Sequence, residues 1–327
     1  MHHRPPRILA AALAALAVAL AGCGGSGGTA AVHATLVLDY IPNAVHAGIY
    51  RALAAGYYRD EGIDLKVVPP SSTSTTLQLI NAGKAQFGLA DGIDVAEQIA
   101  AGRDEQAVMA IVQRPLGAPI ALAKEHLRSA AGLVGKTVGV TGVPSDTAVL
   151  DTVVAHAGGN PAKVKVITVG FDGIPYLEAG RISAFLGYWP DDGVTLQVDG
   201  YPITAFRLDR NGGPAYPGLV AFTTRSLIAR DPKLVSGFVR ATVRGYEDTL
   251  RDPQRSLRDL LAANPTIQRR LARASLAAYL PIFDAGGVPD GTLVPARIAS
   301  LSAWLVRYHL IRRPLPFARF GTDAFLP

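Results

Sequence analysis

The sequence predicts an α/β protein with two lobes. Short apolar runs of strand length alternate with helical patterns along most of the chain, which is typical of parallel sheets covered by helices. This alternation occurs in two successive blocks, residues 33–120 and 121–218. The length of 327 residues suits about two domains, and an apolar content of 49% excludes a wholly disordered chain.

Residues 1–22 are typical of a signal peptide. Two arginines precede the apolar run 8–21, which is too short to span a bilayer and suits the core of a secretion signal. Cys23 follows in the order Leu-Ala-Gly-Cys, which resembles the bacterial lipobox, where cleavage precedes a cysteine that becomes lipidated. The glycine-rich residues 23–32 are predicted to form a flexible linker. The alternative is a chance cysteine beside an ordinary cleavage site.

The composition excludes several other classes of protein. A single cysteine excludes disulfide scaffolds and multi-cysteine metal sites. The net charge of +6 comes without a dense basic module, so nucleic acid is not expected as a partner. The histidines after the signal are dispersed without metal-ligand spacing, and we predict neither a metal site nor a cofactor.

The first block predicts three strands, each followed by a helix. The predicted strands are 35–38, 64–68 and 87–90. The predicted helices are 46–55, 75–82 and 95–101. Parallel strands need a crossover connection of this kind, so the order favours a parallel arrangement.

The second block repeats the pattern, and a helical region follows it. Its predicted strands are 137–140, 164–168 and 184–186, with a helix at 147–156. One more strand is predicted at 219–222, and the chain then becomes mainly helical, with Asp-Pro pairs as helix boundaries. We expect these last helices to pack on the first lobe. Lobe 1 would then comprise residues 33–120 and 219–327, and lobe 2 residues 121–218.

Polar and aromatic residues lie where a ligand is expected in such a fold. Ligands of open α/β sheets bind at the carboxyl ends of strands. Asp39, Tyr40 and Asn43 follow the first predicted strand, and Asp91 and Asp94 follow the third. The alternatives are turn chemistry, with Asn43 capping a helix and Tyr40 half-buried, and solvated acids in a loop.

Two helix starts could bind an anion or a polar ligand tail through their free N–H groups. One contains Ser74, within residues 71–76, and the other is 142–147. Ordinary helix caps would have the same sequence, so that reading stays open.

The segment 38–65 resembles the solute-binding proteins of the thiamine-pyrimidine type, which are grouped with the fungal pyrimidine synthase and with sulfonate and nitrate binders. The resemblance lies in Asp39-Tyr40, in His46 at the helix start and in the Gly-Tyr-Tyr at 56–58, and it continues at 79–88, 133–140, 177–184 and 240–246. It implies a type II periplasmic-binding-protein fold with a ligand cleft between the lobes. Tyr40 departs from the tryptophan usual there.

A second part of this resemblance lies at residues 187–193. Pyrimidine-binding members hold the ring with aromatic residues and an acid in this stretch, so the resemblance implies that Tyr188, Trp189 and Asp192 contact the ligand. The alternative is a surface turn with a tryptophan in the core. The predicted ligand-binding residues are therefore Asp39, Tyr40, Asn43, His46, Ser74, Asp91, Tyr188, Trp189 and Asp192.

These residues favour the capture component of an ABC importer over an enzyme. Acids and aromatic rings suit a weakly basic ring, such as a formylaminopyrimidine precursor of thiamine, whereas sulfonate or nitrate would favour basic residues. Sulfonate, nitrate or another heterocycle remain alternatives. The fungal synthase chemistry needs a Schiff-base lysine with pyridoxal phosphate and a donor histidine, and the matching residues 88–94 contain neither.

The predicted partners follow from this function. They are a small-molecule ligand, a permease with its ATPase, and the cell membrane, reached at its extracytoplasmic face through the lipid on Cys23. We expect a monomer. A sensor domain on the same scaffold would have the same sequence features.

Overall fold

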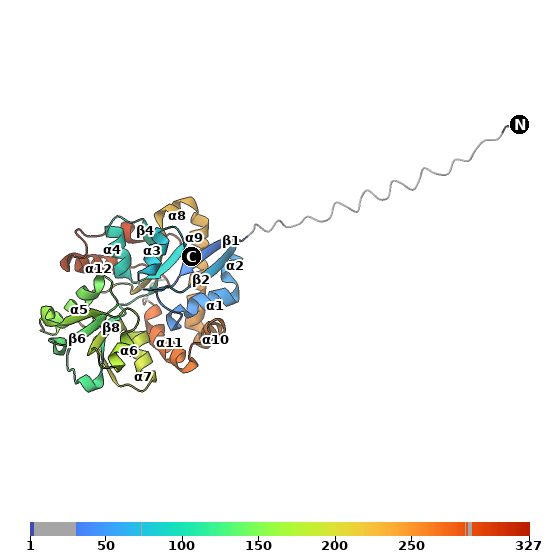
Figure 1. Ribbon diagram of the computed structural model, residues 1–327. Coiled ribbons are helices and arrows are strands. Elements are labelled where there is room, and N and C mark those ends of the chain that lie inside the picture. The colour runs from blue at the N-terminus through green and yellow to red at the C-terminus, as the bar shows by residue number, and fades with distance from the viewer. Residues whose placement is uncertain (3–30, 73, 285, 287–289) are drawn as a thin grey trace. The chain divides into compact units, whose positions relative to one another are not determined.

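Two five-stranded mixed sheets form the fold in the part of the chain that the computed structural model describes, residues 1–2, 31–72, 74–284, 286 and 290–327 (Figure 1). Each sheet forms the centre of one lobe, as the sequence predicts. Cys23 and the predicted signal peptide lie outside the described residues, apart from Met1 and His2.

The sheet of lobe 1 has the strand order β2-β1-β3-β10-β4. Its strands are β1 (Val32–Val37), β2 (Ile63–Val68), β3 (Phe87–Ala90), β4 (Glu105–Val112) and β10 (Leu219–Thr224). β1 pairs in parallel with β2 and β3, while β10 runs antiparallel between β3 and β4. All four residues of β3 are buried, because helices cover both faces of a central strand.

The sheet of lobe 2 has the order β7-β6-β8-β5-β9. Its strands are β5 (Gly117–Leu122), β6 (Thr137–Val140), β7 (Lys165–Thr168), β8 (Ala184–Tyr188) and β9 (Ile203–Ala205). β6 is parallel to β7 and β8, and β5 is antiparallel to β8 and β9. Both lobes thus place the carboxyl ends of several strands at one edge.

Two segments cross between the sheets, residues 113–116 and 206–218. They touch at Gly218, where a Cβ atom would lie 2.2 Å from the Arg114 carbonyl oxygen, so only glycine fits there. The first crossing ends before β5, whereas the sequence placed residues up to 120 in lobe 1. Gln113, Arg114 and Pro115 interrupt the apolar run between β4 and β5, so the sequence marks this crossing, and the predicted lobe boundary at residue 120 did not use that signal.

Helices cover both sheets. Those that precede the second crossing are α1 (Ala47–Ala55), α2 (Tyr57–Asp60), α3 (Thr75–Asn81), α4 (Gly92–Ala100), α5 (Ser145–His156), α6 (Gly173–Glu178) and α7 (Val194–Val198). Those that follow it are α8 (Arg225–Arg230), α9 (Pro232–Arg251), α10 (Pro253–Ala263), α11 (Arg269–Phe283), α12 (Pro295–Arg307) and α13 (Phe317–Phe320).

The predicted Asp-Pro helix boundaries are confirmed. Asp231 caps α9 by accepting a hydrogen bond from the Leu234 amide, and Asp252 caps α10 through the Arg255 amide. In both helices proline occupies the first turn, where its missing N–H costs nothing.

The C-terminal helices contact both lobes and not only lobe 1. α9 packs on α1 so closely that a Cβ at Gly245 would lie 2.1 Å from the Gly48 carbonyl oxygen. In contrast, the Ser275 hydroxyl of α11 donates to the Pro190 carbonyl (2.8 Å), and Trp304 Nε1 of α12 donates to Thr152 of α5 (2.9 Å). The helical pattern shows that one face is buried but not which lobe covers it.

None of the helices in the described part of the chain has the length and apolar character that spanning a bilayer requires.

Candidate ligand-binding site

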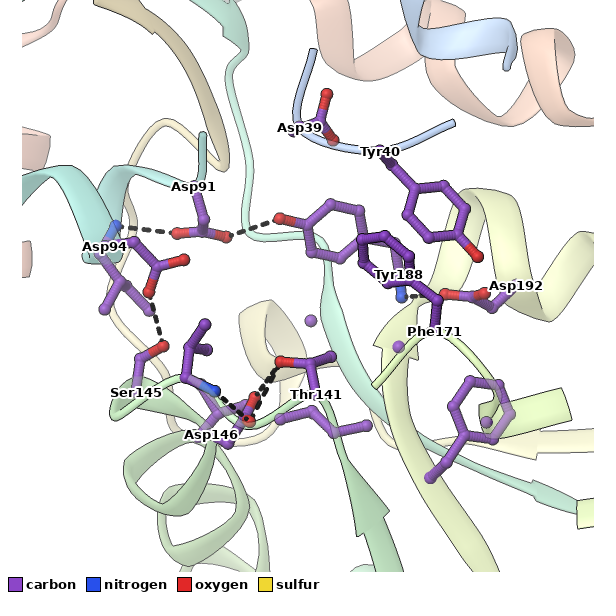
Figure 2. Close-up of a pocket in the computed structure, with 18 of the residues that line it drawn as sticks. Asp39, Tyr40, Asp91, Asp94, Thr141, Ser145, Asp146, Phe171, Tyr188 and Asp192 are labelled. Atoms are coloured by element: carbon purple, nitrogen blue, oxygen red, sulfur yellow. Dashed lines mark hydrogen bonds between the residues drawn. The ribbon is translucent and has the colours of Figure 1, made fainter. Parts of the chain in front are cut away.

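A pocket of about 120 Å³ lies between the two lobes (Figure 2). The strand ends β1, β3, β6, β7 and β8 all contribute to it, as expected for open α/β sheets. The lining residues are Asp39, Tyr40, Asp91, Ile93, Asp94, Gly117, Thr141, Val143, Ser145, Asp146, Val149, Gly170, Phe171, Gly173, Phe185, Leu186, Gly187, Tyr188, Asp191, Asp192 and Tyr216. Six are aspartates, and none of these described lining residues is lysine, arginine or histidine.

Asp39 is held in place by a neutral histidine. The His46 ring is fully buried, and its Nε2 lies 2.9 Å from Asp39 Oδ1. His46 Nδ1 accepts a hydrogen bond from the Asn43 amide (3.1 Å). Because Nδ1 is the acceptor, the ring proton is on Nε2, and Nε2–H donates a hydrogen bond to Asp39. The histidine therefore orients the carboxylate without cancelling its charge.

Aromatic rings from both lobes form the walls. Tyr40, after β1, meets the edge of Phe171, after β7, with ring centroids 4.5 Å apart at 85°. Tyr188, at the end of β8, crosses the pocket, so that its hydroxyl donates to Asp91 Oδ2 (3.4 Å). Burial and the nearby aspartates raise the pKa of Tyr40 and Tyr188, so both remain neutral donors.

Asp91 caps α4 and faces the pocket. One carboxylate oxygen accepts from the Ile93 amide (2.8 Å), and the other accepts from the hydroxyls of Tyr188 and Tyr216. Burial, together with the charge of Asp94, raises the pKa of Asp91 well above its ordinary value.

Asp94 and Asp146 approach one another from opposite lobes. Asp94 Oδ1 accepts from the Ser145 hydroxyl across the cleft (2.8 Å). Asp146 accepts from the Thr141 hydroxyl and from the amides of Gly142 and Val143 at the start of α5. Burial raises the pKa of Asp94 to about 6, and the charge of Asp146 contributes to this shift.

A third acidic group lies on the π-helical turn Trp189–Gly193. Asp191 Oδ2 accepts from the Asn43 side chain of lobe 1 (3.2 Å), and Asp192 Oδ2 accepts from the Tyr188 amide (2.7 Å). Burial raises the pKa of Asp192 to about 6. Burial, followed by the charges of Asp192 and Asp39, raises the pKa of Asp191 well above its ordinary value.

The structure brings five of the nine predicted ligand-binding residues to the pocket. They are Asp39, Tyr40, Asp91, Tyr188 and Asp192. Asn43 and His46 do not line it but hold Asp39 and Asp191 from behind, and Asn43 also caps the 3-10 helix Ala44–His46, as its alternative interpretation expected. Ser74 lies apart from the pocket, where its hydroxyl accepts from Gln78 (3.3 Å).

Trp189 does not line the pocket. The Arg207 guanidinium lies 3.7 Å from the centre of its ring, and its Nε1 donates to the Pro115 carbonyl (3.4 Å). Trp189 therefore contacts both crossings between the lobes. β8 ends at Tyr188, and the π-helical turn that begins at Trp189 directs the indole towards Arg207 and Pro115 instead of the cleft.

Several lining residues were not among the nine predicted ligand-binding residues. The predicted helix start 142–147 does reach the pocket, but its free amides bind Asp146 of the same segment, and the carboxylate of Asp146 was not predicted. Asp146 follows β6 at a helix start just as Asp91 follows β3, so the same strand-end argument could have found it. Phe171 follows β7 in the same way. Asp191 precedes a predicted residue by one position. Tyr216 lies in the second crossing, where no sequence signal marks it.

The two sheets, the paired crossings and the pocket between the lobes define a two-lobe periplasmic-binding-protein fold. The alkanesulfonate-binding protein SsuA from Xanthomonas axonopodis pv. citri, bound to MOPS, has this fold, with a TM-score of 0.71, at 17% identity over 89% of this chain and 98% of that one. Residues 43–256 match the NMT1/THI5-like family, and the chain belongs to this family.

Two relatives illustrate the range of functions around this chain. The formylaminopyrimidine-binding protein of Halalkalibacterium halodurans is 29% identical over 295 residues, which cover 89% of this chain and 88% of the relative. The 4-amino-5-hydroxymethyl-2-methylpyrimidine phosphate synthase of Legionella pneumophila is 26% identical over 251 residues, or 76% and 79% of the two chains.

Proposed function

We propose that this protein is the solute-binding component of an ABC importer and that it captures an aminopyrimidine of the thiamine-precursor type. One observation carries the proposal: the pocket combines aromatic walls with six aspartates and no basic side chain among its described lining residues. The similarity to a formylaminopyrimidine-binding protein supports the same ligand class.

The chemistry of an aminopyrimidine suits this lining. The ring presents a flat π surface to Tyr40, Phe171 and Tyr188, and aromatic contacts of this kind tolerate offset or edge geometry. Its exocyclic amine and a ring nitrogen lie side by side, so a carboxyl group can bind both in a bidentate arrangement. Asp192 and Asp39 line the pocket from opposite lobes, and in this proposal they bind that edge of the ring.

An anionic ligand does not suit the pocket, even though solved structures with this fold include sulfonate-binding proteins. A sulfonate or a nitrate would meet six carboxyl groups without a compensating cation, and like charges in a buried site repel strongly. The fold is therefore shared while the ligand chemistry differs.

The size of the pocket favours a single ring. Its volume is about 120 Å³, and an apolar cavity of about 150 Å³ is large enough for benzene. A tricyclic ligand such as a flavin would need the lobes to separate further.

We further propose that the protein binds its ligand without converting it. The synthase chemistry that the family resemblance implies relies on a lysine and a donor histidine beside the ligand. The described residues that line the pocket include neither, and His46 is buried behind Asp39 with both ring nitrogens engaged.

Location and anchoring complete the proposal. Export by the N-terminal signal and lipidation of Cys23 would tether the binding protein at the extracytoplasmic face of the membrane, beside its permease and ATPase. Cys23→Ser should move the protein from the membrane fraction to the soluble extracytoplasmic fraction. If Cys23→Ser stays with the membrane after its signal peptide has been removed, anchoring through this cysteine is excluded.

Calorimetry tests the ligand class directly. The probes are 4-amino-5-hydroxymethyl-2-methylpyrimidine, riboflavin, taurine and nitrate. We expect the aminopyrimidine to bind, taurine and nitrate to give no heat, and riboflavin to bind more weakly. Tighter binding of taurine or nitrate than of the aminopyrimidine would overturn the proposed function.

A further inference from the structure

The six pocket aspartates fall into two separate groups. Asp91, Asp94 and Asp146 form one, which we call the α4–α5 group because the three residues lie at the starts of those helices. Asp39, Asp191 and Asp192 form the other, which we call the β8 group because two of them follow β8. Within each group the charge of one carboxyl raises the pKa of a neighbouring one, so the carboxyls lie close enough to interact.

The Tyr188 side chain separates the two groups. Its backbone amide donates to Asp192, and its hydroxyl, at the far end of the side chain, donates to Asp91. The full length of a tyrosine therefore lies between them. Figure 2 shows Asp91, Asp94 and Asp146 at one side of the pocket and Asp192 at the other, with the Tyr188 ring between. The pocket is acidic at both ends and aromatic in the middle.

Both groups combine carboxyls from the two lobes. In the α4–α5 group Asp94 comes from lobe 1 and Asp146 from lobe 2, and in the β8 group Asp39 faces Asp191 in the same way. The donors that these carboxyls already have are neutral hydroxyls, amides and an imidazole, so they orient the oxygens without supplying positive charge. Closing the lobes thus brings like charges together at each end.

A ligand with a single polar edge would satisfy only one end. An aminopyrimidine edge suits the β8 group, beside Tyr40, and leaves the α4–α5 group without a counter-charge. A positively charged arm on the same ring would reach the second group, because a charged amine donates three hydrogen bonds to acceptors around it.

Resting on the proposed function, we infer that the ligand is a cationic aromatic amine, with its ring beside Tyr188 and an alkylammonium arm between Asp94 and Asp146. In pyrimidine terms, the arm would be a free aminomethyl group. A formylated arm is a neutral amide, whose oxygen would face carboxylates. The inferred ligand therefore differs from the formylaminopyrimidine for which the relative in Halalkalibacterium halodurans is named.

Three probes that share one ring test the inference by calorimetry on the wild-type protein. They are 4-amino-5-aminomethyl-2-methylpyrimidine, its N-formyl derivative, and the 5-hydroxymethyl analogue. We expect the free amine to bind at least about tenfold more tightly than either neutral probe, as is typical of a charged hydrogen bond in a buried site.

Variants then locate the arm. Asp94→Asn and Asp146→Asn should each weaken binding of the free amine by about tenfold more than they weaken binding of the hydroxymethyl probe. Asp192→Asn should weaken both, because it acts on the shared ring. Asp199→Asn, an exposed aspartate outside the pocket, is the matched control and should change neither.

The outcomes separate this inference from the proposed function. If the formylated or hydroxymethyl probe binds as tightly as the free amine, the cationic arm is excluded while aminopyrimidine binding stands. If the two asparagine variants weaken all probes equally, the arm does not lie between Asp94 and Asp146. If none of the three probes binds, the proposed function fails and the inference fails with it.

Discussion

The side-chain amide of Asn43 donates to Asp191 Oδ2 over 3.2 Å and so joins the loop after β1 in lobe 1 to the turn after β8 in lobe 2. The same residue accepts from the Val45 amide with its oxygen and donates its own backbone amide to His46 Nδ1. One asparagine therefore fixes the loop, orients the histidine behind Asp39 and links the lobes.

Replacing this asparagine should weaken ligand binding. Asn43→Ala removes the side-chain hydrogen bond between the lobes and the cap on the Val45 amide, whereas the backbone amide that donates to His46 Nδ1 remains. We expect the Kd for the aminopyrimidine to rise by about three- to tenfold, the value of one or two modest hydrogen bonds. Calorimetry measures the change. Asn160→Ala is a suitable control, since Asn160 caps the exposed 3-10 helix Pro161–Lys163. An unchanged Kd in Asn43→Ala would show that the link carries no binding energy.

Trp189 should matter for stability more than for affinity. Its ring packs between Arg207 and the Pro115 carbonyl, outside the pocket. Trp189→Phe should lower the melting temperature because it loses the indole hydrogen bond and part of the packing. We expect its Kd to stay within about twofold, whereas Tyr188→Ala should raise the Kd by about tenfold or more. A large loss of affinity in folded Trp189→Phe would place the tryptophan at the ligand after all.

The ligand-free protein should become less stable as the pH rises from about 4 to about 8. Burial, with the charges of Asp94 and Asp146, raises the pKa of Glu97 on α4 to about 8. The unfolded chain releases this proton near its ordinary value, so between the two pKa values the folded state binds more protons and loses stability with rising pH. Asp94 and Asp192 add to this loss up to about pH 6.

A variant isolates the contribution of Glu97. In Glu97→Gln the decline in unfolding free energy between pH 5 and pH 8 should be smaller by ~1–2 kcal/mol, a value reduced for solvent screening. Chemical denaturation at several pH values measures it. A variant whose stability falls with pH as steeply as that of the wild type would contradict the assignment to Glu97.

A single added methyl group at Gly218 should destabilise the protein strongly. The added Cβ in Gly218→Ala meets the Arg114 carbonyl, which is backbone and cannot rotate away. We expect a loss of about 3 kcal/mol in the free energy of unfolding. Gly117→Ala, whose Cβ would meet only Val149 at 3.6 Å, is the control for stability. Equal stability of the two variants would mean that the crossings separate readily.

The alternation of short apolar runs with helical patterns predicted the fold, because central strands are buried on both faces whereas each helix buries one face. The strand-end argument likewise led to Asp39, Tyr40, Asp91 and Asp94, which line the pocket, and the family resemblance led to Tyr188. It did not separate Tyr188 from Trp189, since both are aromatic and only the direction of each side chain decides which one lines the cleft. Asp146 and Asp94 face each other only after two distant segments fold together, and no local pattern encodes such a meeting.

The contact between Arg114 and Gly218 has a mechanical consequence for the whole molecule. Two bodies joined by one strand can both bend and twist about it. Two connections whose backbones touch at this point oppose twisting, because a twist would pull them apart, while bending keeps them together. The contact thereby restricts the relative motion of the lobes mainly to a hinge rotation about one axis. Each opening and closing then returns the same carboxyl groups to the same places.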